Sequence, residues 1–276
     1  MLRIKDLSKA YNKHQALSNI SFEVPKGQIT GLLGHNGAGK TTLMRIITRI
    51  LQQDSGEVIL NDSKISADIT RKEIGYLPEE RGLYKGMKVN EYLSYIAKLR
   101  GIEKKERNQK IEHWIKKLNL QDWKNQEINA LSKGMQQKVQ FIAALLHNPS
   151  LLILDEPFSG FDPVNEQNLM NEIVKLKEKG VTILFSTHRM DSVEELCDNI
   201  VFLNKGKTIY KGDVISLMKE YEQDNFVVET TNGKTLVETE NLQQYIQQQS
   251  TNSLVSINKE KKTLKEIFIT KVNDEY

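Results

Sequence analysis

The chain contains a single cysteine, Cys197, among 276 residues. One cysteine excludes an internal disulfide framework and fits a protein kept in a reducing compartment. No apolar run approaches the ~18 residues that a membrane-spanning helix needs. The first residues, Met1 to Asp6, also lack the apolar core of a signal peptide. The sequence therefore predicts a cytosolic protein that needs a partner to work at a membrane.

Strong charge of either sign is also missing. Lysine and arginine number 39 against 36 aspartate and glutamate residues, a net charge of +3 that is spread along the chain. Binding of nucleic acid usually requires a concentrated basic face, so we expect no nucleic-acid partner. The 38% of hydrophobic residues suffice for a sizeable core, and the length allows one large domain with a small appendage.

One glycine-rich segment carries the strongest motif of the chain, the P-loop pattern G-x-x-x-x-G-K-[ST] followed by a second threonine. Its residues are Gly34, His35, Asn36, Gly37, Ala38, Gly39, Lys40, Thr41 and Thr42. An apolar strand pattern precedes it and a helical pattern follows, which is the context that the motif requires. Backbone N–H groups and the helix N-terminus would face the phosphates of a nucleoside triphosphate. Lys40 would reach the β- and γ-phosphates, and Thr41 would ligate Mg²⁺.

The order of strand and helix patterns predicts an α/β protein. Short strand patterns lie at residues 2–11, 20–24, 28–33, 56–60 and 74–77. Helical patterns follow at 89–99, 103–118 and 132–146, then a buried strand at 151–154, a helix at 165–179 and a strand at 181–186. Strands that alternate with helices indicate a parallel, doubly wound sheet. The helical block at about 85–147 interrupts it.

The composition changes after Gly212. We interpret residues 222–276 as a small α/β accessory domain, with strands at 226–229 and 254–257 and a helix at 264–271. Glutamines gather at 243–249, but Tyr245 and Ile246 interrupt them. This favours a solvated helix face over a prion-like segment.

A second motif follows the apolar run at 151–154. Asp155 ends that strand and Glu156 comes next, which is the Walker B pattern. Asp155 would hold Mg²⁺, and Glu156 is placed to orient or deprotonate the attacking water. A strand that ends in an acidic turn is common, so this interpretation depends on the P-loop upstream.

A third segment, Leu131 to Met135, opens the helix at 132–146. Taken alone, Ser132 is best explained as an ordinary helix N-cap. Ser132 with exposed backbone amides, and Gly134 allowing a close approach, could instead form a second anion site.

Together these motifs resemble the ATP-binding cassette of ABC transporters over residues 2–215. The resemblance is carried by five segments in order: the P-loop, Leu131 to Met135, Leu154 to Pro157, Ser159 to Asp162, and Thr187-His188. It implies a RecA-like P-loop NTPase core with an antiparallel β-subdomain, the inserted helical subdomain and the C-terminal appendage. It also implies ATP hydrolysis with ATP and Mg²⁺.

The resemblance gives roles to residues that would otherwise be unremarkable. Tyr11 stands where the family stacks an aromatic ring on adenine, and His188 where it contacts the γ-phosphate. Ser132 and Gly134 would face the γ-phosphate bound by a second cassette, and Asp162 would lie in the segment that crosses that interface. Otherwise Tyr11 is an ordinary strand-end tyrosine and His188 a surface histidine.

The chain departs from the usual family pattern at two places. Lys133 and Met135 replace a glycine and the glutamine of the signature Leu-Ser-Gly-Gly-Gln. Glu79 stands where most cassettes have a glutamine that senses the γ-phosphate and Mg²⁺. Because a carboxylate repels phosphate, we expect Glu79 to act through Mg²⁺ or water. These variants and the appendage resemble the cassettes of type-2 ABC exporters.

The resulting hypothesis is a cytosolic ATPase subunit that drives a separate membrane permease and is held by it at the cytoplasmic face of the membrane. The subunit would pair with an identical chain or with a paralogue. The alternative is an ABC ATPase of DNA repair or of the ribosome. Repair members insert a long coiled coil, whereas only 91 positions separate Lys40 from Leu131 here, and ribosomal members carry two cassettes in one chain. A regulatory ATP sensor would need a crippled site, yet Glu156 and His188 are both present.

Overall fold

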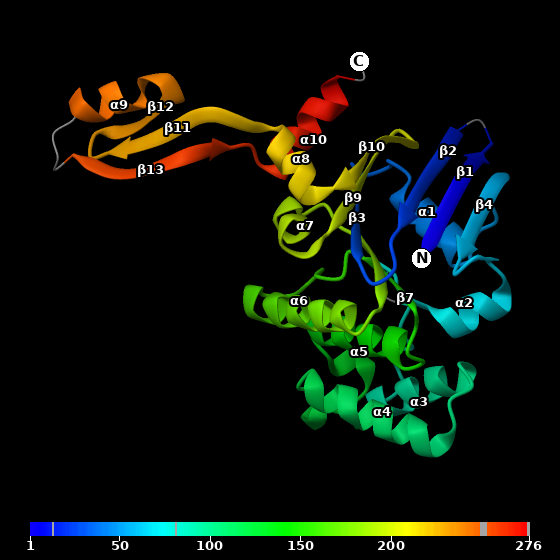
Figure 1. Cartoon of the computed structure of the whole chain (residues 1–276). Helices are drawn as coiled ribbons and strands as arrows, with labels where there is room; N and C mark the ends of the chain where they lie inside the picture. The colour runs from blue at the N-terminus through cyan, green and yellow to red at the C-terminus, as the bar shows by residue number, and fades with distance from the viewer. Residues whose placement is uncertain (13, 81, 249–252, 275–276) are drawn as a thin grey trace. The chain divides into compact units, whose positions relative to one another are not determined.

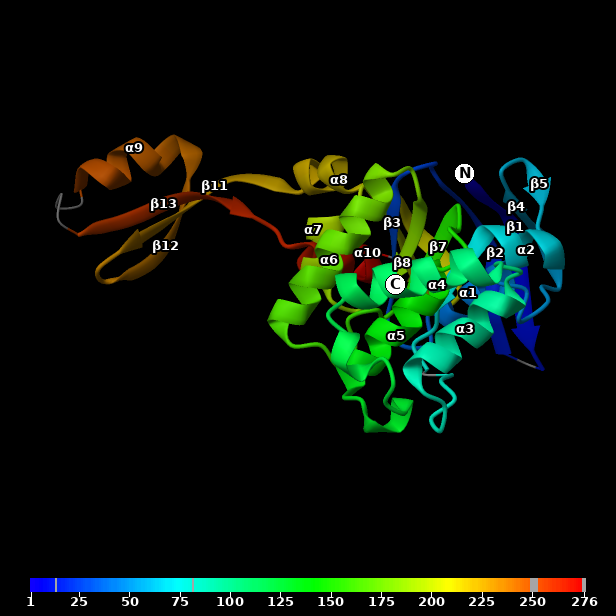
Figure 2. The same ribbon diagram turned by 90° about the horizontal axis from the view of Figure 1, so that it is seen from below.

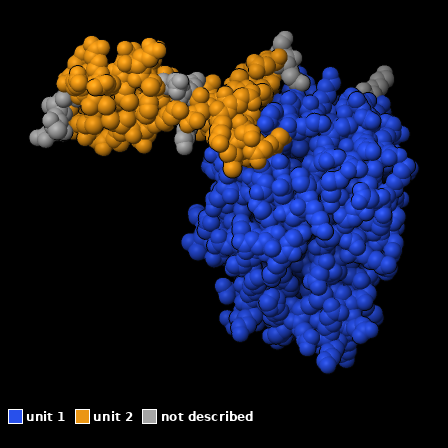
Figure 3. Space-filling model, viewed as in Figure 1, with its two compact units in different colours: residues 1–211 blue, residues 212–276 orange. Residues whose placement is uncertain are grey.

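The computed structural model describes residues 1–12, 14–80, 82–248 and 253–274. They form two compact units, residues 1–211 and 212–276 (Figure 3). The expected start of the accessory domain at about residue 222 lies inside the second unit. Among the described residues, no helix is long and apolar enough to cross a membrane.

The first unit contains a six-stranded sheet that forms its centre (Figure 1). Its strands, in spatial order, are β10 (Lys207–Asp213), β9 (Asn199–Asn204), β3 (Ile29–Leu33), β8 (Thr182–Ser186), β7 (Leu151–Asp155) and β6 (Ile74–Leu77). The strands from β9 to β6 pair in parallel. Every residue of β3, β7 and β8 is buried, as expected of a sheet covered on both faces.

A second sheet of the first unit is antiparallel. Its strands, in spatial order, are β2 (His14–Val24), β1 (Leu2–Tyr11), β4 (Ser55–Leu60) and β5 (Ser63–Lys64). Apolar side chains of β1, β2 and β4 share one buried cluster with Leu43, Met44 and residues of the central sheet. This cluster anchors α1 (Lys40–Ile47), the helix that the P-loop opens.

Helices form the rest of the first unit. They are α2 (Ala67–Glu73), α3 (Val89–Leu99), α4 (Lys104–Lys117), α5 (Lys133–Leu145), α6 (Pro163–Glu178) and α7 (Met190–Leu196), with short 3-10 turns at Gln121–Trp123 and Ile128–Ala130. Helices α3, α4 and α5 contact one another and form the inserted helical block, and α5 also contacts β6 (Figures 1 and 2). The predicted α/β fold with an antiparallel subdomain and a helical insertion is confirmed.

In its described residues, the second unit combines a three-stranded antiparallel sheet with three helices. Its elements are α8 (Val214–Glu220), β11 (Glu222–Thr230), β12 (Gly233–Glu238), α9 (Thr239–Gln248), β13 (Leu254–Lys261) and α10 (Leu264–Asn273). The described part of the glutamine run lies on α9, which has no buried residue. Gln249 lies outside the described residues.

Candidate nucleotide-binding and catalytic site

Two glycines of the P-loop stand where a side chain would not fit. Gly39 caps α1 at φ 106°, in the left-handed region that side chains disfavour. A Cβ atom there would also come within 2.7 Å of the Ala16 carbonyl oxygen, and one on Gly34 within 2.5 Å of the Leu203 carbonyl oxygen. The loop can therefore curl tightly between β3 and α1.

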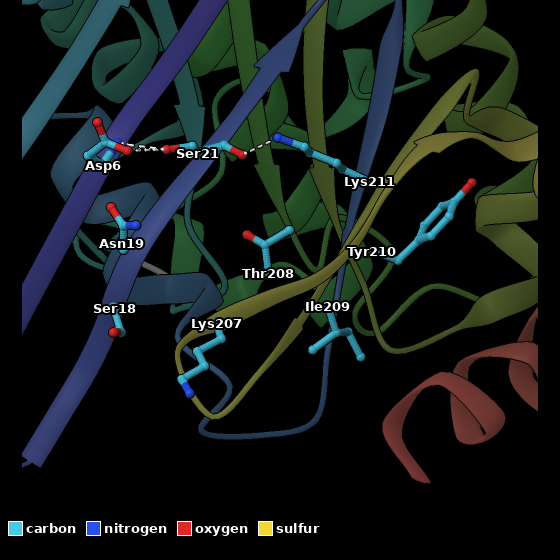
Figure 4. A pocket seen from close by; sticks show the side chains of 9 residues that line it. All are labelled: Asp6, Ser18, Asn19, Ser21, Lys207, Thr208, Ile209, Tyr210 and Lys211. Atoms are coloured by element: carbon cyan, nitrogen blue, oxygen red, sulfur yellow. Dashed lines mark hydrogen bonds between the residues drawn. The ribbon is translucent and has the colours of Figure 1, made fainter. Parts of the chain in front are cut away.

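The turn between β9 and β10 holds this loop in place. The Gly206 amide donates to the Ala38 carbonyl oxygen at 3.1 Å, and the Gly206 carbonyl oxygen accepts from the Ser18 amide at 2.7 Å. Beyond this contact, β2 and β10 border a polar cavity of about 780 Å³, across which Lys211 donates to the Ser21 carbonyl oxygen (Figure 4). None of the predicted site residues lines this cavity.

Lys40 is buried at the start of α1, with 9% of its surface exposed. Its Nζ donates to the carbonyl oxygens of Gly34 at 2.7 Å and His35 at 3.2 Å. Burial lowers the pKa of the Lys40 ammonium, while the nearby carboxylates of Glu156, Asp155 and Glu79 oppose that shift. The Asp155-Glu156 segment, distant in sequence, therefore lies near enough to the P-loop lysine to act on its charge.

Asp155 lies at the carboxyl end of β7 with 1% of its surface exposed. Its Oδ1 accepts from Ser186 Oγ at 2.8 Å, and its Oδ2 accepts from Thr41 Oγ1 at 3.4 Å. Burial raises the pKa of the Asp155 carboxyl. A hydroxyl and a carboxylate are the hard oxygen donors that Mg²⁺ prefers, so Thr41 and Asp155 fit such an ion.

We expect Asp155→Asn to raise stability while it removes activity. Because folding raises the pKa of Asp155, its stabilising contribution is complete below the ordinary value near 3.8 and is lost as the pH rises through the raised value. At neutral pH the ionised carboxyl is therefore unfavourable, and asparagine relieves it. The unfolding midpoint without nucleotide should rise by about 2–4 °C, while Mg²⁺-dependent turnover falls at least ~100-fold.

Calorimetry at pH 7 and a phosphate-release assay measure both effects. Asp122→Asn, at an exposed position between α4 and α5, is the matched control and should change neither. A lower midpoint for Asp155→Asn would show that burial does not dominate the energetics of this carboxyl.

Glu156 has an unusual backbone for a glutamate, with φ 49° in the left-handed region. This conformation costs about 1–2 kcal/mol, and the amide of Glu156, which donates to the Ser186 carbonyl oxygen at 2.9 Å, helps to hold it. The carboxylate accepts from Thr187 Oγ1 at 3.1 Å and pairs with His188 Nδ1 at 2.9 Å. Because a carboxylate only accepts, we assign the proton to Nδ1.

Tyr11 lies at the end of β1 and keeps 43% of its surface exposed. The Lys9 ammonium lies 6.0 Å from the centre of its ring. An exposed ring of this kind can stack on a nucleotide base, which is worth about 1–3 kcal/mol. The contact with adenine itself stays a prediction.

We therefore expect Tyr11→Ala to weaken ATP binding about tenfold and Tyr11→Phe to leave it within twofold, since stacking needs the ring and not the hydroxyl. Titration with a fluorescent ATP analogue measures the Kd. Tyr95→Ala is the matched control, because Tyr95 is similarly exposed at 41% but lies on α3. Equal losses in both alanine variants would contradict the role of Tyr11.

The signature segment contacts the turn that precedes α6. Ser132 caps α5 by accepting from the Met135 amide at 3.3 Å. A Cβ atom on Gly134 would come within 3.1 Å of the Gly160 carbonyl oxygen, so this glycine lets the two segments approach closely. Asp162 caps α6 through the amides of Val164 and Asn165.

The other predicted residues surround the loop. His35, Asn36 and Gly37 are exposed, Ala38 is buried, and Thr42 is half-buried on α1. Glu79 is exposed after β6, yet its charge acts on both Lys40 and Asp155. Its place near the Thr41–Asp155 pair is consistent with a contact through a metal ion or water.

Two contacts near the site escaped sequence reasoning. Ser186 was not predicted to support Asp155, and the ion pair between Glu166 and Arg189, the residue after His188, was not foreseen either. A serine at the end of an apolar strand was the available signal for the first. The ion pair joins residues of two different helices, and no local pattern marks it.

Comparison with known proteins gives one consistent result. The sequence profile of the ABC transporter family matches residues 17–159. The uncharacterized ABC transporter ATP-binding protein YhaQ of Bacillus subtilis is 45% identical over 83% of this chain and 76% of its own. The linearmycin resistance ATP-binding protein LnrL of the same organism is 32% identical over 84% of this chain and 76% of its own. A solved ATP-binding subunit of an ABC transporter superposes with a TM-score of 0.75 at 31% identity, covering 80% of this chain and 93% of that one.

Proposed function

This chain belongs to the ABC transporter family as an ATP-hydrolysing, ATP-binding subunit, and we propose that it drives a separate type-2 exporter permease at the cytoplasmic face of the membrane. The observation that carries the hydrolytic part is the convergence of the P-loop with the ends of β7 and β8. Lys40, Thr41, Asp155, Glu156 and His188 meet there through the contacts described above.

Each residue of this cluster has a separate role in phosphoryl transfer. Glu156 orients the attacking water and accepts its proton, and His188 holds the Glu156 carboxylate from the side. Lys40 and the P-loop amides stabilise the charge that spreads over the γ-phosphate oxygens. Thr41 and Asp155 would hold Mg²⁺, which would supply positive charge against the phosphates. Glu79 would act on that ion or on a water molecule.

A second cassette completes the site in this proposal. Ser132 and Gly134 at the start of α5 face the ATP bound by the other copy, and Asp162 lies where the copies meet. The close approach of Gly134 to Gly160 supports this, because it ties the signature segment to the turn that Asp162 ends. The second copy is an identical chain or a paralogue.

The permease docks on the helical block and on the loop that precedes α3, which carries Tyr84. Tyr84 and Tyr95 are both large and exposed, and their rings meet edge to face at 5.9 Å. Exposed aromatic pairs of this kind are enriched in protein interfaces. Export is supported by the exporter-like segment around Glu79 and by LnrL, whose name states a role in resistance.

Affinity purification from gently solubilised membranes of the host tests the proposal. We expect a polytopic permease in stoichiometric amount with the wild-type chain, and loss of that permease with Tyr84→Ala/Tyr95→Ala while ATPase activity remains. Trp123→Ala, at another exposed aromatic of the same block, is the control and should keep the permease. Recovery with ribosomes, with DNA or without any partner would overturn the transport role.

A further inference from the structure

A buried carboxylate lies behind the catalytic cluster. Glu166 is on α6, and 7% of its surface is exposed. One of its oxygens pairs with the Arg189 guanidinium, and the other accepts from Ser192 Oγ at 3.3 Å. Burying a carboxylate is unfavourable unless it is paired, so this contact needs both partners in place.

The partners of Glu166 belong to the segment that carries His188. Arg189 directly follows His188 and is the residue before α7, whose first turn contains Ser192. The Arg189 amide donates to Thr187 Oγ1 at 3.1 Å, and that hydroxyl in turn donates to Glu156. One hydrogen-bonded path therefore runs from Glu166 through Arg189 and Thr187 to the Glu156 carboxylate.

Glu166 is also linked to the predicted interface between cassettes. It lies one helical turn after Asp162, the N-cap of α6, and its amide donates to the Asp162 carbonyl oxygen at 2.9 Å. A shift of the Asp162 turn would move the start of α6 and with it the Glu166 carboxylate. The two ends of this path are thus the turn before α6 and the catalytic pair of Glu156 and His188.

We propose that Glu166 is a positioning residue for His188, which holds the Thr187–Arg189 segment against α6 so that Glu156 keeps its orientation. Arg189 has 47% of its side chain exposed, whereas the Glu166 side chain has 9%, so the carboxylate is the fixed member of the pair. The proposal rests on the proposed roles of Glu156 and His188. It adds that the position of α6 sets the geometry of His188.

Glu166→Gln is the direct test, because it removes the charge and keeps the shape. We expect kcat for ATP to fall about tenfold, since small misplacements of catalytic groups are costly, while KM and the melting temperature change little. Glu172→Gln is a matched control. Glu172 lies on the same helix, is equally buried at 7%, and is paired with two cations, Lys117 and Lys175, which are not next to His188.

Two further measurements separate positioning from simple support of the fold. In a Thr187→Ala/His188→Ala background, which lacks both contacts from this segment to the Glu156 carboxylate, single-turnover hydrolysis should show no additional loss from Glu166→Gln. The exchanged pair Glu166→Arg/Arg189→Glu should recover activity relative to either single variant. Equal losses in the wild-type and the Thr187→Ala/His188→Ala backgrounds, or equal losses in Glu166→Gln and Glu172→Gln, would overturn the proposal. An inactive wild-type chain would instead contradict the hydrolytic function itself.

Discussion

Replacing Glu156 by glutamine is expected to lower ATP turnover roughly 10³-fold, because general-base catalysis typically contributes ~10²–10⁴-fold. The ATP affinity should change less than threefold. The substitution leaves Lys40 and the P-loop backbone untouched, and these are the groups expected to bind the phosphates. The variant should therefore separate binding from chemistry.

The neighbours of Glu156 explain why the loss is large. Both carboxylate oxygens are engaged, one by Thr187 Oγ1 and one by His188 Nδ1. A glutamine can accept from only one of them, and its NH₂ group would face the other. If that group faces the histidine, His188 must carry its proton on Nε2 instead of Nδ1. The variant thus loses the base, and in that orientation it also changes the tautomer of His188.

The same variant tests the proposed pairing of cassettes. Slow hydrolysis should leave ATP bound between two copies, so light scattering after size exclusion should show an ATP-dependent dimer for Glu156→Gln. Glu178→Gln, at the exposed end of α6, serves as the control and should behave as wild type. A Glu156→Gln chain that stays monomeric at saturating ATP and Mg²⁺ would contradict pairing by the isolated chain.

Local chemistry explains which parts of this protein could be predicted from its sequence. The P-loop and Asp155-Glu156 are short segments in which the functional residues stand at fixed positions along the sequence. Each motif could therefore be recognised without knowledge of the fold. The buried strands β7 and β8 were equally clear, because a sheet covered on both faces needs continuous apolar runs. The helix α5 begins where predicted, with Ser132 as its cap.

Elements held by caps or irregular pairing were harder to predict. Helix α2 has no buried residue and begins at a Ser66 cap, so it shows no apolar periodicity. Strand β2 begins at His14 rather than at residue 20, since register shifts against β1 break the alternation of its side chains. Helix α6 begins two residues before the predicted start, at Pro163, where the Asp-Pro pair was a missed start signal.

Contacts between segments that are distant in the sequence were the features that could not be predicted. The pairing of Glu166 with Arg189 and the bond from Ser186 to Asp155 depend on where α6, α7 and β8 lie in the folded chain. Each of these residues is unremarkable in its local sequence. A single sequence therefore reveals the groups that touch the nucleotide better than the groups that hold them.

Lys40→Ala should abolish measurable hydrolysis and weaken ATP binding at least ~100-fold. A lysine held in a partly buried site interacts with phosphate far more strongly than one in water. Its loss also leaves the carboxylates of Glu156, Asp155 and Glu79 without their nearby cation, so the site would repel an anionic ligand. The variant should thus lose the attraction between the lysine and the phosphates, and it should also lose the cation that offsets the three carboxylates.

Lys40→Arg should not restore activity, since the planar guanidinium needs more room than the ammonium and Lys40 is packed against the Gly34 and His35 carbonyl oxygens. Isothermal titration with ATP and Mg²⁺ measures binding, and phosphate release measures turnover. Lys72→Ala removes an exposed lysine from the end of α2 and should leave both unchanged. Turnover above about a tenth of wild type in Lys40→Ala would show that hydrolysis occurs elsewhere, because no other described lysine acts on the Asp155 carboxyl in the same way.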